Sequence, residues 1–555
     1  MKIYFQVFQF LKKYQPYSVY ALIFIFVVTS LFEAFGISLI MPFIAIVLDE
    51  NFLNILQNSS FGHFVPNFIY EMERDEALLF FSLALVSMYL VKNFTLVISE
   101  YFKWLFINQT KANLSNALIK KYLHQDYIFH SKKNTSEINA MINQKLTDLT
   151  DGLIGSVLTI FAEIILVVGL LSLIIFFKQL DTFLILLALF SFGILSGKII
   201  NTFIKKLGIK RQAKVNEKFV NFNTITNNFR EILLIGKIGV YFKSFKNSLN
   251  LIAKWDAIRS SLQKTPHLVF ETIGVVGLIS IIYYLLNNNV SSIKIITVCT
   301  FFAAVSYRAI PSLNKIFYFH YNIKYYKPIF SEIINELNID DKIEYHEEKF
   351  EEINSIKANN ISFKYDNQKT FILENINFEI KKNSSIGIYG KSGSGKTSLL
   401  DIFSGLVSPN KGYLTVNDNK INNRYLRRKL QNNISYTSQK TTVINDSLLK
   451  NVCFGLEENK INQSYYEKIL EIVELKDLEK SFKDNLNKMS DLGSNVSGGQ
   501  LQRIGIARAL YQNKEILIFD EATNALDEEL ENRIMSKLND MKSKKTIIVV
   551  SHNIE

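Results

Sequence analysis

The residues from Gly390 to Thr397 carry the strongest chemical signal in this sequence, because three glycines and a Lys–Thr pair lie between an apolar run and a helix-like run. Glycines allow backbone N–H groups to close around phosphate oxygens at the positive end of a helix dipole. Lys396 would reach the β- and γ-phosphates, and Thr397 would ligate Mg²⁺. The pattern predicts a triphosphate site made of Gly390, Lys391, Ser392, Gly393, Ser394, Gly395, Lys396, Thr397 and Ser398.

A second signal is the pair Asp520–Glu521, which follows the apolar run Ile516–Phe519. Four apolar residues predict a buried strand, and Asp520 at its tip could hold the hydration shell of the metal ion. Glu521 would polarise the water that attacks the γ-phosphate. The alternative is an ordinary acidic pair that caps a helix, but the phosphate-binding loop elsewhere in the chain favours the catalytic interpretation.

The elements that must position these residues are short β-rich runs that alternate with helical segments from Ile353 onward. This alternation predicts an α/β fold with a largely parallel sheet. The expected strands are Ser385–Tyr389, Ile434–Thr437, Ile516–Phe519 and Thr546–Val550.

The first part of the chain has a different composition, with six apolar stretches long enough to cross a bilayer. They lie near residues 18–48, 77–102, 153–177, 181–200, 267–287 and 291–318. We therefore expect a multidomain protein: an all-α, six-helix transmembrane domain over 1–326, a charged linker over 327–352 and an α/β nucleotide-binding domain with a P-loop over 353–555.

Composition agrees with a membrane half joined to a soluble half, since 48% of the 555 residues are hydrophobic and 21% are charged. The net charge of +12 could indicate nucleic-acid binding. However, the lysines and arginines gather in the two long loops after the second and fourth spans, whereas the loop at 49–76 is acidic. This distribution places the basic loops and both chain ends in the cytoplasm. We expect no nucleic-acid partner and no cleavable signal peptide.

The segment Val496–Gln500 resembles the signature of the ATP-binding-cassette superfamily, and the resemblance covers the whole soluble half. It implies that ATP and Mg²⁺ are the ligands. It also implies that Ser497, Gly498, Gly499 and Gln500 begin a helix that binds the γ-phosphate held by an opposite subunit.

The same resemblance assigns roles to further residues, in the order that the family has them. Tyr365 would stack on adenine, and Gln439 would sense Mg²⁺ and contact the membrane domain. The loop Asn524–Asp527 would cross a dimer interface, and His552 would contact the γ-phosphate. A lone histidine is more often structural, but the position of His552 after the strand Ile547–Val550 favours the catalytic role.

Sharing of each ATP between two subunits implies a dimer, most simply a homodimer. Both sites would then contain Glu521 and His552. The chain stops three residues after His552, earlier than cassettes of this family usually do, and the sequence leaves open whether this end is natural or truncated.

Six spans before the cassette resemble the exporter type of this superfamily, called the type IV fold. In that type, short transverse helices carry motion from the cassettes to the membrane domain. We expect such helices at Gln125–His130 and Asn228–Ile238; the alternative is that both are ordinary turns.

Ionisable residues inside membrane spans are costly and are functional hypotheses by default. Lys92, His267, Arg308 and Lys315 could line a cavity with positive charge, which suits an anionic headgroup such as a pyrophosphate. Two alternatives are snorkelling of Lys92 and Lys315 to the interface, and pairing of the cations with Glu33, Glu163 or Glu271.

A finer resemblance involves Phe32–Phe43, Tyr307–Arg308 with Pro311–Ser312, and Ser490–Asn495. These segments are similar to bacterial flippases that move lipid-linked oligosaccharides for protein N-glycosylation. The resemblance implies a polyprenyl-pyrophosphate glycan as substrate and the bacterial inner membrane, with its lipids, as the location. The alternatives are an exporter of lipids, peptides or drugs and, more distantly, an ATP-gated channel or a regulatory membrane ATPase.

Overall fold

The computed structural model describes residues 2–48, 72–176, 180–288, 292–340, 347–365, 368–484, 488–489, 495–523, 526–541 and 543–551. Contacts divide the chain into two compact units. The helical unit comprises Met1–Leu123 and Lys133–Asp340. The cassette unit comprises Asp341–Glu555 together with the short segment His124–Lys132.

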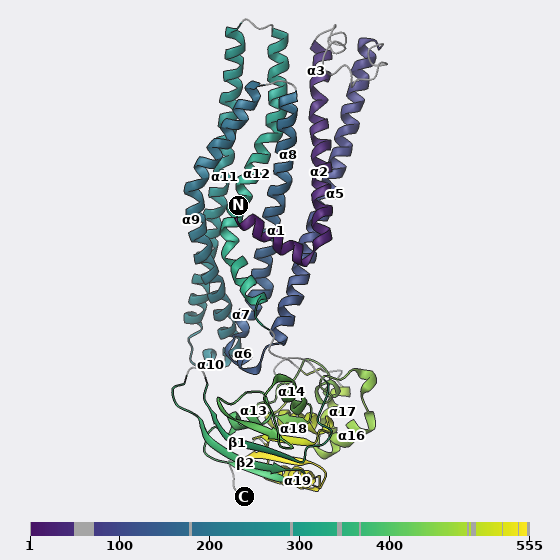
Figure 1. Ribbon diagram of the computed structural model, residues 1–555, viewed down its shortest axis with the longest axis vertical. Helices are drawn as coiled ribbons and strands as arrows, with labels where there is room; N and C mark the ends of the chain where they lie inside the picture. The colour runs from purple at the N-terminus through teal and green to yellow at the C-terminus, as the bar shows by residue number, and fades with distance from the viewer. Residues whose placement is uncertain are drawn as a thin grey trace. The chain divides into compact units, whose positions relative to one another are not determined.

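Long helices make up the helical unit and run side by side in it, while α1 lies across them (Figure 1). The long helices are α2 (Pro16–Ser38), α5 (Arg74–Leu123), α8 (Gly155–Phe176), α9 (Leu180–Asn227), α11 (Ile238–Asn287) and α12 (Ser292–Leu337). The shorter ones are α1 (Lys2–Tyr14), α3 (Ile40–Leu48), α7 (Thr135–Asn139) and α10 (Phe229–Leu234). Two π-helical stretches, η3 (Ala140–Lys145) and η4 (Asp148–Ile154), lead into α8.

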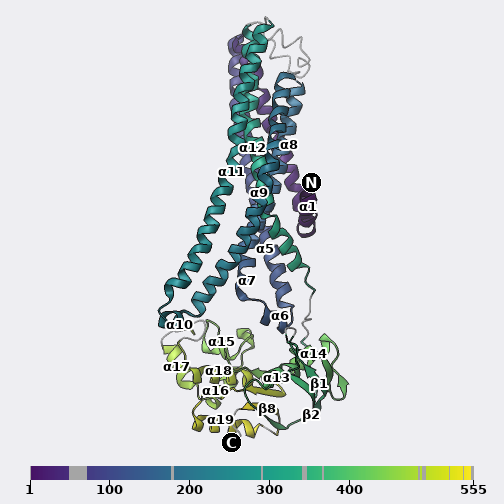
Figure 2. The ribbon, with the colours of Figure 1, turned by 90° about the vertical axis from the view of Figure 1, so that its left-hand side faces the viewer.

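The core of this unit forms where α12 packs along α8 and α11. Leu170 of α8, Phe270 of α11 and Val305 of α12 are buried in one apolar cluster. The helices α9 and α11 lie beside each other and are joined by α10 (Figure 2). The buried cluster fixes which faces of α8, α11 and α12 meet.

In the described part of the chain, four helices are long and apolar enough to cross a membrane: Ser18–Ser38, Arg74–Leu123, Thr135–Ser172 and Ile238–Asn287. They contain the predicted spans 77–102 and 267–287 and overlap in part with the predicted spans 18–48 and 153–177. The predicted span 181–200 lies in α9, and residues 292–318 of the last predicted span lie in α12. The crossing of the membrane by these two helices stays a prediction.

The first predicted span is not one continuous helix, because α2 ends at Ser38 and α3 begins at Ile40. Pro42 explains the break, since proline has no N–H to donate to the carbonyl of Ser38. The prediction also missed α1. Its residues Ile3, Val7 and Leu11 are buried and recur every four positions, which is the helical signal that the sequence offered.

The predicted linker 327–352 is wrong in its first part, because α12 continues to Leu337. Ile333 is fully buried on this extension. Glu336 lies 2.5 Å from Lys133, and Glu332 pairs with Lys145. The charges that suggested a solvated linker therefore bind α12 to the segment before α8.

Two sheets make up the strand part of the cassette unit. The strands β3 (Ser385–Tyr389), β6 (Ile434–Thr437), β7 (Ile516–Asp520) and β8 (Thr546–Ser551) form a parallel sheet in the order β3-β8-β7-β6. This confirms the four predicted strands. The second sheet, which the sequence did not lead us to expect, is antiparallel in the order β2-β1-β4-β5; it contains β1 (Ser355–Phe363), β2 (Leu373–Lys381), β4 (Lys411–Val416) and β5 (Asn419–Lys420).

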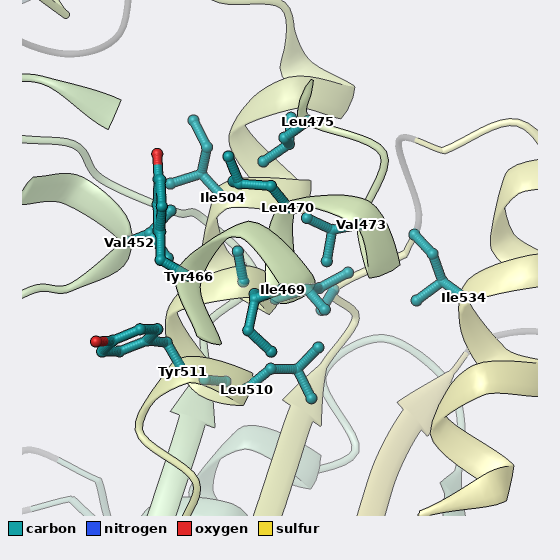
Figure 3. Close-up of a cluster of buried hydrophobic side chains, with 14 of the residues drawn as sticks. Val452, Tyr466, Ile469, Leu470, Val473, Leu475, Ile504, Leu510, Tyr511 and Ile534 are labelled. Carbon is teal, nitrogen blue, oxygen red and sulfur yellow. The ribbon is translucent and has the colours of Figure 1, made fainter. Parts of the chain in front are cut away.

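The helices of this unit are α13 (Lys396–Phe403), α14 (Arg424–Gln431), α15 (Leu448–Val452), α16 (Gln463–Ile472), α17 (Lys476–Asp484), α18 (Gly498–Tyr511) and α19 (Glu528–Asp540), with a 3₁₀ turn at Glu458–Lys460. A buried cluster under α18 joins Tyr466 and Ile469 of α16 to Ile504 and Leu510 (Figure 3). Each such side chain contributes roughly 1.5–3 kcal/mol on burial, so the cluster fixes the position of α18.

The segment His124–Lys132 forms a short helix, α6 (Tyr127–Lys132), and Ile128 packs against an apolar cluster of the cassette. This agrees with the prediction of a transverse helix that contacts the cassette at Gln125–His130. The second predicted segment also contains a helix, α10, where Leu234 is 78% exposed. Contact of α10 with a cassette stays a prediction.

Candidate functional site

The phosphate-binding loop connects β3 to α13, as predicted. Gly393 has a φ of +80° and Gly395, the N-cap of α13, has a φ of +92°. A Cβ atom on Gly395 would lie 2.9 Å from side-chain atoms of Ile372 and Leu373. The Lys396 ammonium donates to the carbonyls of Gly390 at 2.7 Å and Lys391 at 3.2 Å. The lysine is thereby held over its own loop.

Gly395→Ala is expected to weaken ATP binding by about tenfold, because a left-handed residue with a side chain costs roughly 1–2 kcal/mol and the new methyl group would displace Ile372. The measurement is equilibrium binding of a fluorescent ATP analogue. Gly387→Ala in β3 is the matched control, since a Cβ there meets nothing within 4 Å. Equal binding by the two variants would contradict this view of the loop.

The predicted catalytic and metal residues meet at the carboxyl end of the parallel sheet. The Thr397 hydroxyl donates to Asp520 Oδ2 at 3.4 Å, and Gln439 Nε2 donates to Glu521 Oε2 at 2.6 Å. Glu521 is only 8% exposed and has a φ of +52°. A non-glycine residue in the left-handed region is strained, and such strain concentrates at functional sites.

One residue at this edge was not predicted from the sequence. Tyr436 on β6 donates its hydroxyl hydrogen to Asp520 Oδ2 at 2.9 Å. Burial, and then the Asp520 carboxylate, raises the pKa of Tyr436 above its ordinary value, so the hydroxyl remains a donor. The sequence feature that could have identified Tyr436 was its position on a predicted strand, three residues before Gln439.

Asp401 on α13 is a buried carboxyl group near Asp520. Burial, followed by repulsion from Asp520, raises the pKa of Asp401 from 3.8 to about 6. The folded protein therefore binds this proton more tightly than the unfolded chain does. The contribution of Asp401 to stability decreases as pH rises from 3.8 to about 6 and stays low above that range.

Asp401→Asn is therefore expected to stabilise the metal-free cassette by up to about 3 kcal/mol at neutral pH and to have little effect at about pH 4, below both pKa values. Denaturant-dependent labelling of the buried thiol of Cys453 would measure this in a Cys299→Ser background. Asp477→Asn, at an exposed position of α17, is the control. The same stability difference at both pH values would refute the assignment.

The predicted signature residues begin α18. The Ser497 hydroxyl accepts the Gln500 N–H at 3.2 Å, and the Gln500 side chain accepts the Ser497 N–H at 2.8 Å. This capping box leaves Ser497 and Gly498 exposed. The first turn of α18 is thus presented outward, as binding of a phosphate held by another subunit requires.

Two other predicted nucleotide residues have local roles in the structure. The Tyr365 hydroxyl lies 3.3 Å from Ser398 Oγ, which brings this aromatic side chain to the phosphate-binding helix. Asp527 caps α19 by accepting the Leu530 N–H at 3.2 Å. His552, Asn524, Ala525 and residues 490–494 lie outside the described residues, so their assigned roles stay predictions.

The donor set at the sheet edge fits Mg²⁺. Thr397, Gln439 and Asp520 offer hydroxyl, amide and carboxylate oxygens, which Mg²⁺ prefers. Burial raises the pKa of Asp520, a cost that a bound cation would offset. Among the described residues, no group of three His, Cys, Asp or Glu side chains could hold a metal. The set of Thr397, Gln439 and Asp520 therefore suits an ion that is also coordinated by phosphate oxygens.

The predicted substrate residues do not form one group of unpaired cations. Arg308 Nε lies 2.5 Å from Glu33 Oε1, and Lys315 Nζ lies 2.6 Å from Glu163 Oε1. The pairing that the sequence left open therefore holds for Arg308 and Lys315. The Lys92 ammonium lies 4.4 Å from the ring centroid of Tyr89.

His267 lies apart from these pairs, in a groove of about 380 Å³ between α11 and α12. The groove also contains Glu271, Ser306 and Tyr307, and its other walls are apolar. Binding of substrate by any of the four predicted residues stays a prediction.

Two family models match the chain, one for each unit. The model described as ABC transporter matches residues 373–524, and the model described as ABC transporter transmembrane region matches residues 37–307. The chain belongs to the ABC transporter family. In this family an ATP-binding cassette with ATPase activity is coupled to transport.

Two relatives show how far the similarity extends. An ATP-dependent lipid A-core flippase of Aliivibrio fischeri is 34% identical over 200 residues, 36% of this chain and 34% of that protein. The chain thus matches about a third of such flippases. A multidrug resistance ABC transporter ATP-binding and permease protein of Lactococcus lactis is 24% identical over 453 residues, 80% of this chain and 75% of that protein.

A solved structure of a bacterial Atm1-family ABC exporter with ATP bound matches with a TM-score of 0.76 at 16% identity. It covers 98% of this chain and 91% of the exporter chain. The predicted fold class, a helical transmembrane domain followed by an α/β cassette in the type IV ABC exporter arrangement, is confirmed.

Proposed function

We propose that two copies of this ABC transporter chain form an ATP-driven exporter of lipid-type or multidrug substrates. The observation that supports hydrolysis is the meeting of the phosphate-binding loop, Gln439, Asp520 and Glu521 at one sheet edge. The exposed first turn of α18 supports the sharing of each nucleotide between two subunits. The homodimer follows because one chain carries one loop and one such turn.

The residues divide the chemistry among them. Glu521 accepts a proton from the attacking water, and the amide of Gln439 keeps the carboxylate in place. Lys396 and the N–H groups of its loop stabilise negative charge on the phosphates. When bound, Mg²⁺ neutralises phosphate charge that would otherwise repel the nucleophile. His552, the residue that follows β8 in the chain, would stabilise the γ-phosphate.

For the substrate, we propose a lipid-linked oligosaccharide with a pyrophosphate headgroup, flipped across the bacterial inner membrane for protein glycosylation. The supporting observation is a charged cluster on α2, α5, α8 and α12, in which Glu33 interacts electrostatically with Arg308, Lys92 and Glu163. With Lys315, which pairs with Glu163, the cluster contains three cations against two anions. A net positive charge within membrane helices favours an anionic headgroup.

A glycan needs a transporter to cross a bilayer because its polar groups would have to enter hydrocarbon. Moving an unpaired polar group into hydrocarbon costs about 2–7 kcal/mol, so a molecule with many hydroxyl groups does not cross unaided. The groove with His267 and Glu271 offers polar contacts beside apolar walls, which suits an amphiphile. Membrane lipids are therefore partners as well. The basic loops favour an orientation in which the cassette and both chain ends lie in the cytoplasm.

The test is headgroup accessibility in proteoliposomes that contain a polyprenyl-pyrophosphate glycan. Wild-type protein with ATP should move the headgroup across the bilayer, and Glu521→Gln should not. Flipping by both proteins at the same rate would refute the ATP-driven mechanism.

A multidrug exporter is the second candidate, because the Lactococcus lactis relative that matches most of the chain has that name. Stimulation of the ATPase by hydrophobic drugs but not by the glycan lipid would favour it. A passive ion current in patch recordings would instead support a channel.

A further inference from the structure

The end of β7 carries two neighbouring carboxylates that must keep different orientations, one toward a metal and one toward water. A single short stretch of the chain, β6 and the residues that follow it, reaches both. Gln439 holds Glu521 at 2.6 Å, and Tyr436, three residues earlier, holds Asp520 at 2.9 Å.

The strand register explains why Tyr436 can reach Asp520. In the parallel pair of β6 and β7, Tyr436 lies opposite Ile518 and Thr437 lies opposite Phe519. The long phenol side chain therefore extends from a position level with Ile518 to the carboxylate two residues farther along β7. A serine or threonine hydroxyl at the same position is too short to cover that distance.

The hydroxyl contacts one particular oxygen of Asp520. Tyr436 and Thr397 both donate to Oδ2, at 2.9 and 3.4 Å. Two donors on one oxygen, one from β6 and one from α13, restrict rotation of the carboxylate about its Cβ–Cγ bond. The ring of Tyr436 is itself restrained, since it packs against the apolar cluster that includes Ile434 and Ile518.

We propose that Tyr436 is a positioning residue for the metal step of ATP hydrolysis, in which its hydroxyl orients the Asp520 carboxylate toward the metal that accompanies the nucleotide. This inference rests on the proposed ATPase activity. Tyr436 acts through Asp520, to which its hydroxyl donates. Its contribution is therefore to the affinity for the metal rather than to the affinity for ATP.

Tyr436→Phe removes the hydroxyl and keeps the ring. Hydrogen bonds to charged groups are stronger than those between neutral groups, and part of the restraint on Asp520 should be retained through Thr397. The Mg²⁺ concentration that gives half-maximal ATPase activity should rise about tenfold. Binding of a fluorescent ATP analogue in EDTA should not change. Mn²⁺ bound to the nucleotide-loaded protein, measured by electron paramagnetic resonance, should weaken by a similar factor.

One further variant makes the test specific. Tyr413→Phe, on β4 and away from the site, should leave the metal dependence unchanged. An unchanged Mg²⁺ dependence in Tyr436→Phe would overturn the inference. So would an equal loss of metal-free nucleotide binding, because that result would show a general effect on the nucleotide site.

The outcomes also separate this inference from the proposed function. Absence of Mg²⁺-dependent ATP hydrolysis in the wild-type protein would refute the proposed function. A wild-type protein that hydrolyses ATP, together with a Tyr436→Phe variant of identical metal affinity, would refute only the role of Tyr436.

Discussion

Replacement of Glu521 by glutamine is expected to lower ATP turnover by about 10²- to 10⁴-fold while ATP binding is retained. The glutamine side chain has nearly the same shape but cannot accept a proton from water. Gln439 would still contact the side chain, which lies 8% exposed at the end of β7, so the local structure should persist. Steady-state phosphate release measures the loss, and equilibrium nucleotide binding measures what remains.

Glu467→Gln is the matched control, because Glu467 is an exposed residue of α16 and its substitution removes the same charge from the same unit. This variant should turn over ATP at the wild-type rate. A turnover of Glu521→Gln within threefold of wild type would show that another group activates the water, and the left-handed strain at Glu521 would then need a different explanation.

Removal of Arg308 alone should have the largest effect on the stability of the helical unit. Arg308 Nη2 donates a hydrogen bond to Glu33 at 2.9 Å, Arg308 Nε lies 2.5 Å from the other carboxylate oxygen, and the Glu33 side chain is only 2% exposed. Arg308→Ala leaves a buried carboxylate without its cation, which costs about 3–5 kcal/mol. Both tryptophans, Trp104 and Trp255, lie in this unit, so their fluorescence on heating or denaturation reports its unfolding.

The double variant Glu33→Leu with Arg308→Leu separates stability from substrate binding. Because both charges are removed, much of the lost stability should return. If Arg308 also binds the headgroup, substrate stimulation of the ATPase should stay lost in the double variant. Lys206→Ala, an exposed cation of α9, serves as the control. A normal melting temperature for Arg308→Ala would contradict the structural importance of the pair.

The parallel sheet and its site could be predicted because their signals are local. Each strand is a short apolar run, and the residues with functional side chains come after it in the chain, as Asp520 comes after Ile516–Phe519. Parallel strands bring their carboxyl ends to one edge, so Thr397, Gln439 and Glu521 could be expected together although the chain separates them widely.

The antiparallel sheet had no comparable signal. Its strands β1 and β2 contain Asn360 and Asn375, both with positive φ, and the pairing of these strands shifts register near Asn360. Asparagine is depleted in strands and common in turns. The sheet is therefore stabilised by packing of its buried face, a property that local residue preferences do not express.

The sequence alone could not show which of the intramembrane charges pair with one another. Arg308 and Glu33 are 275 residues apart, and the sequence gives the spacing of charges along each helix but not the angle at which the helix faces its neighbours. That angle depends on tertiary packing, here on the cluster of Leu170, Phe270 and Val305.

The π-helical stretches η3 and η4 have a consequence for that angle. A π turn includes about one residue more than an α turn, and one residue corresponds to about 100° of rotation around a helix. All side chains of α8 therefore point in directions offset from those of an uninterrupted α-helix. Glu163, which follows η4, faces Lys315 only with this offset. Deleting a single residue from η4 would thus turn a distant carboxylate away from its cation, so the winding of this stretch sets the angular phase of α8 inside the bundle.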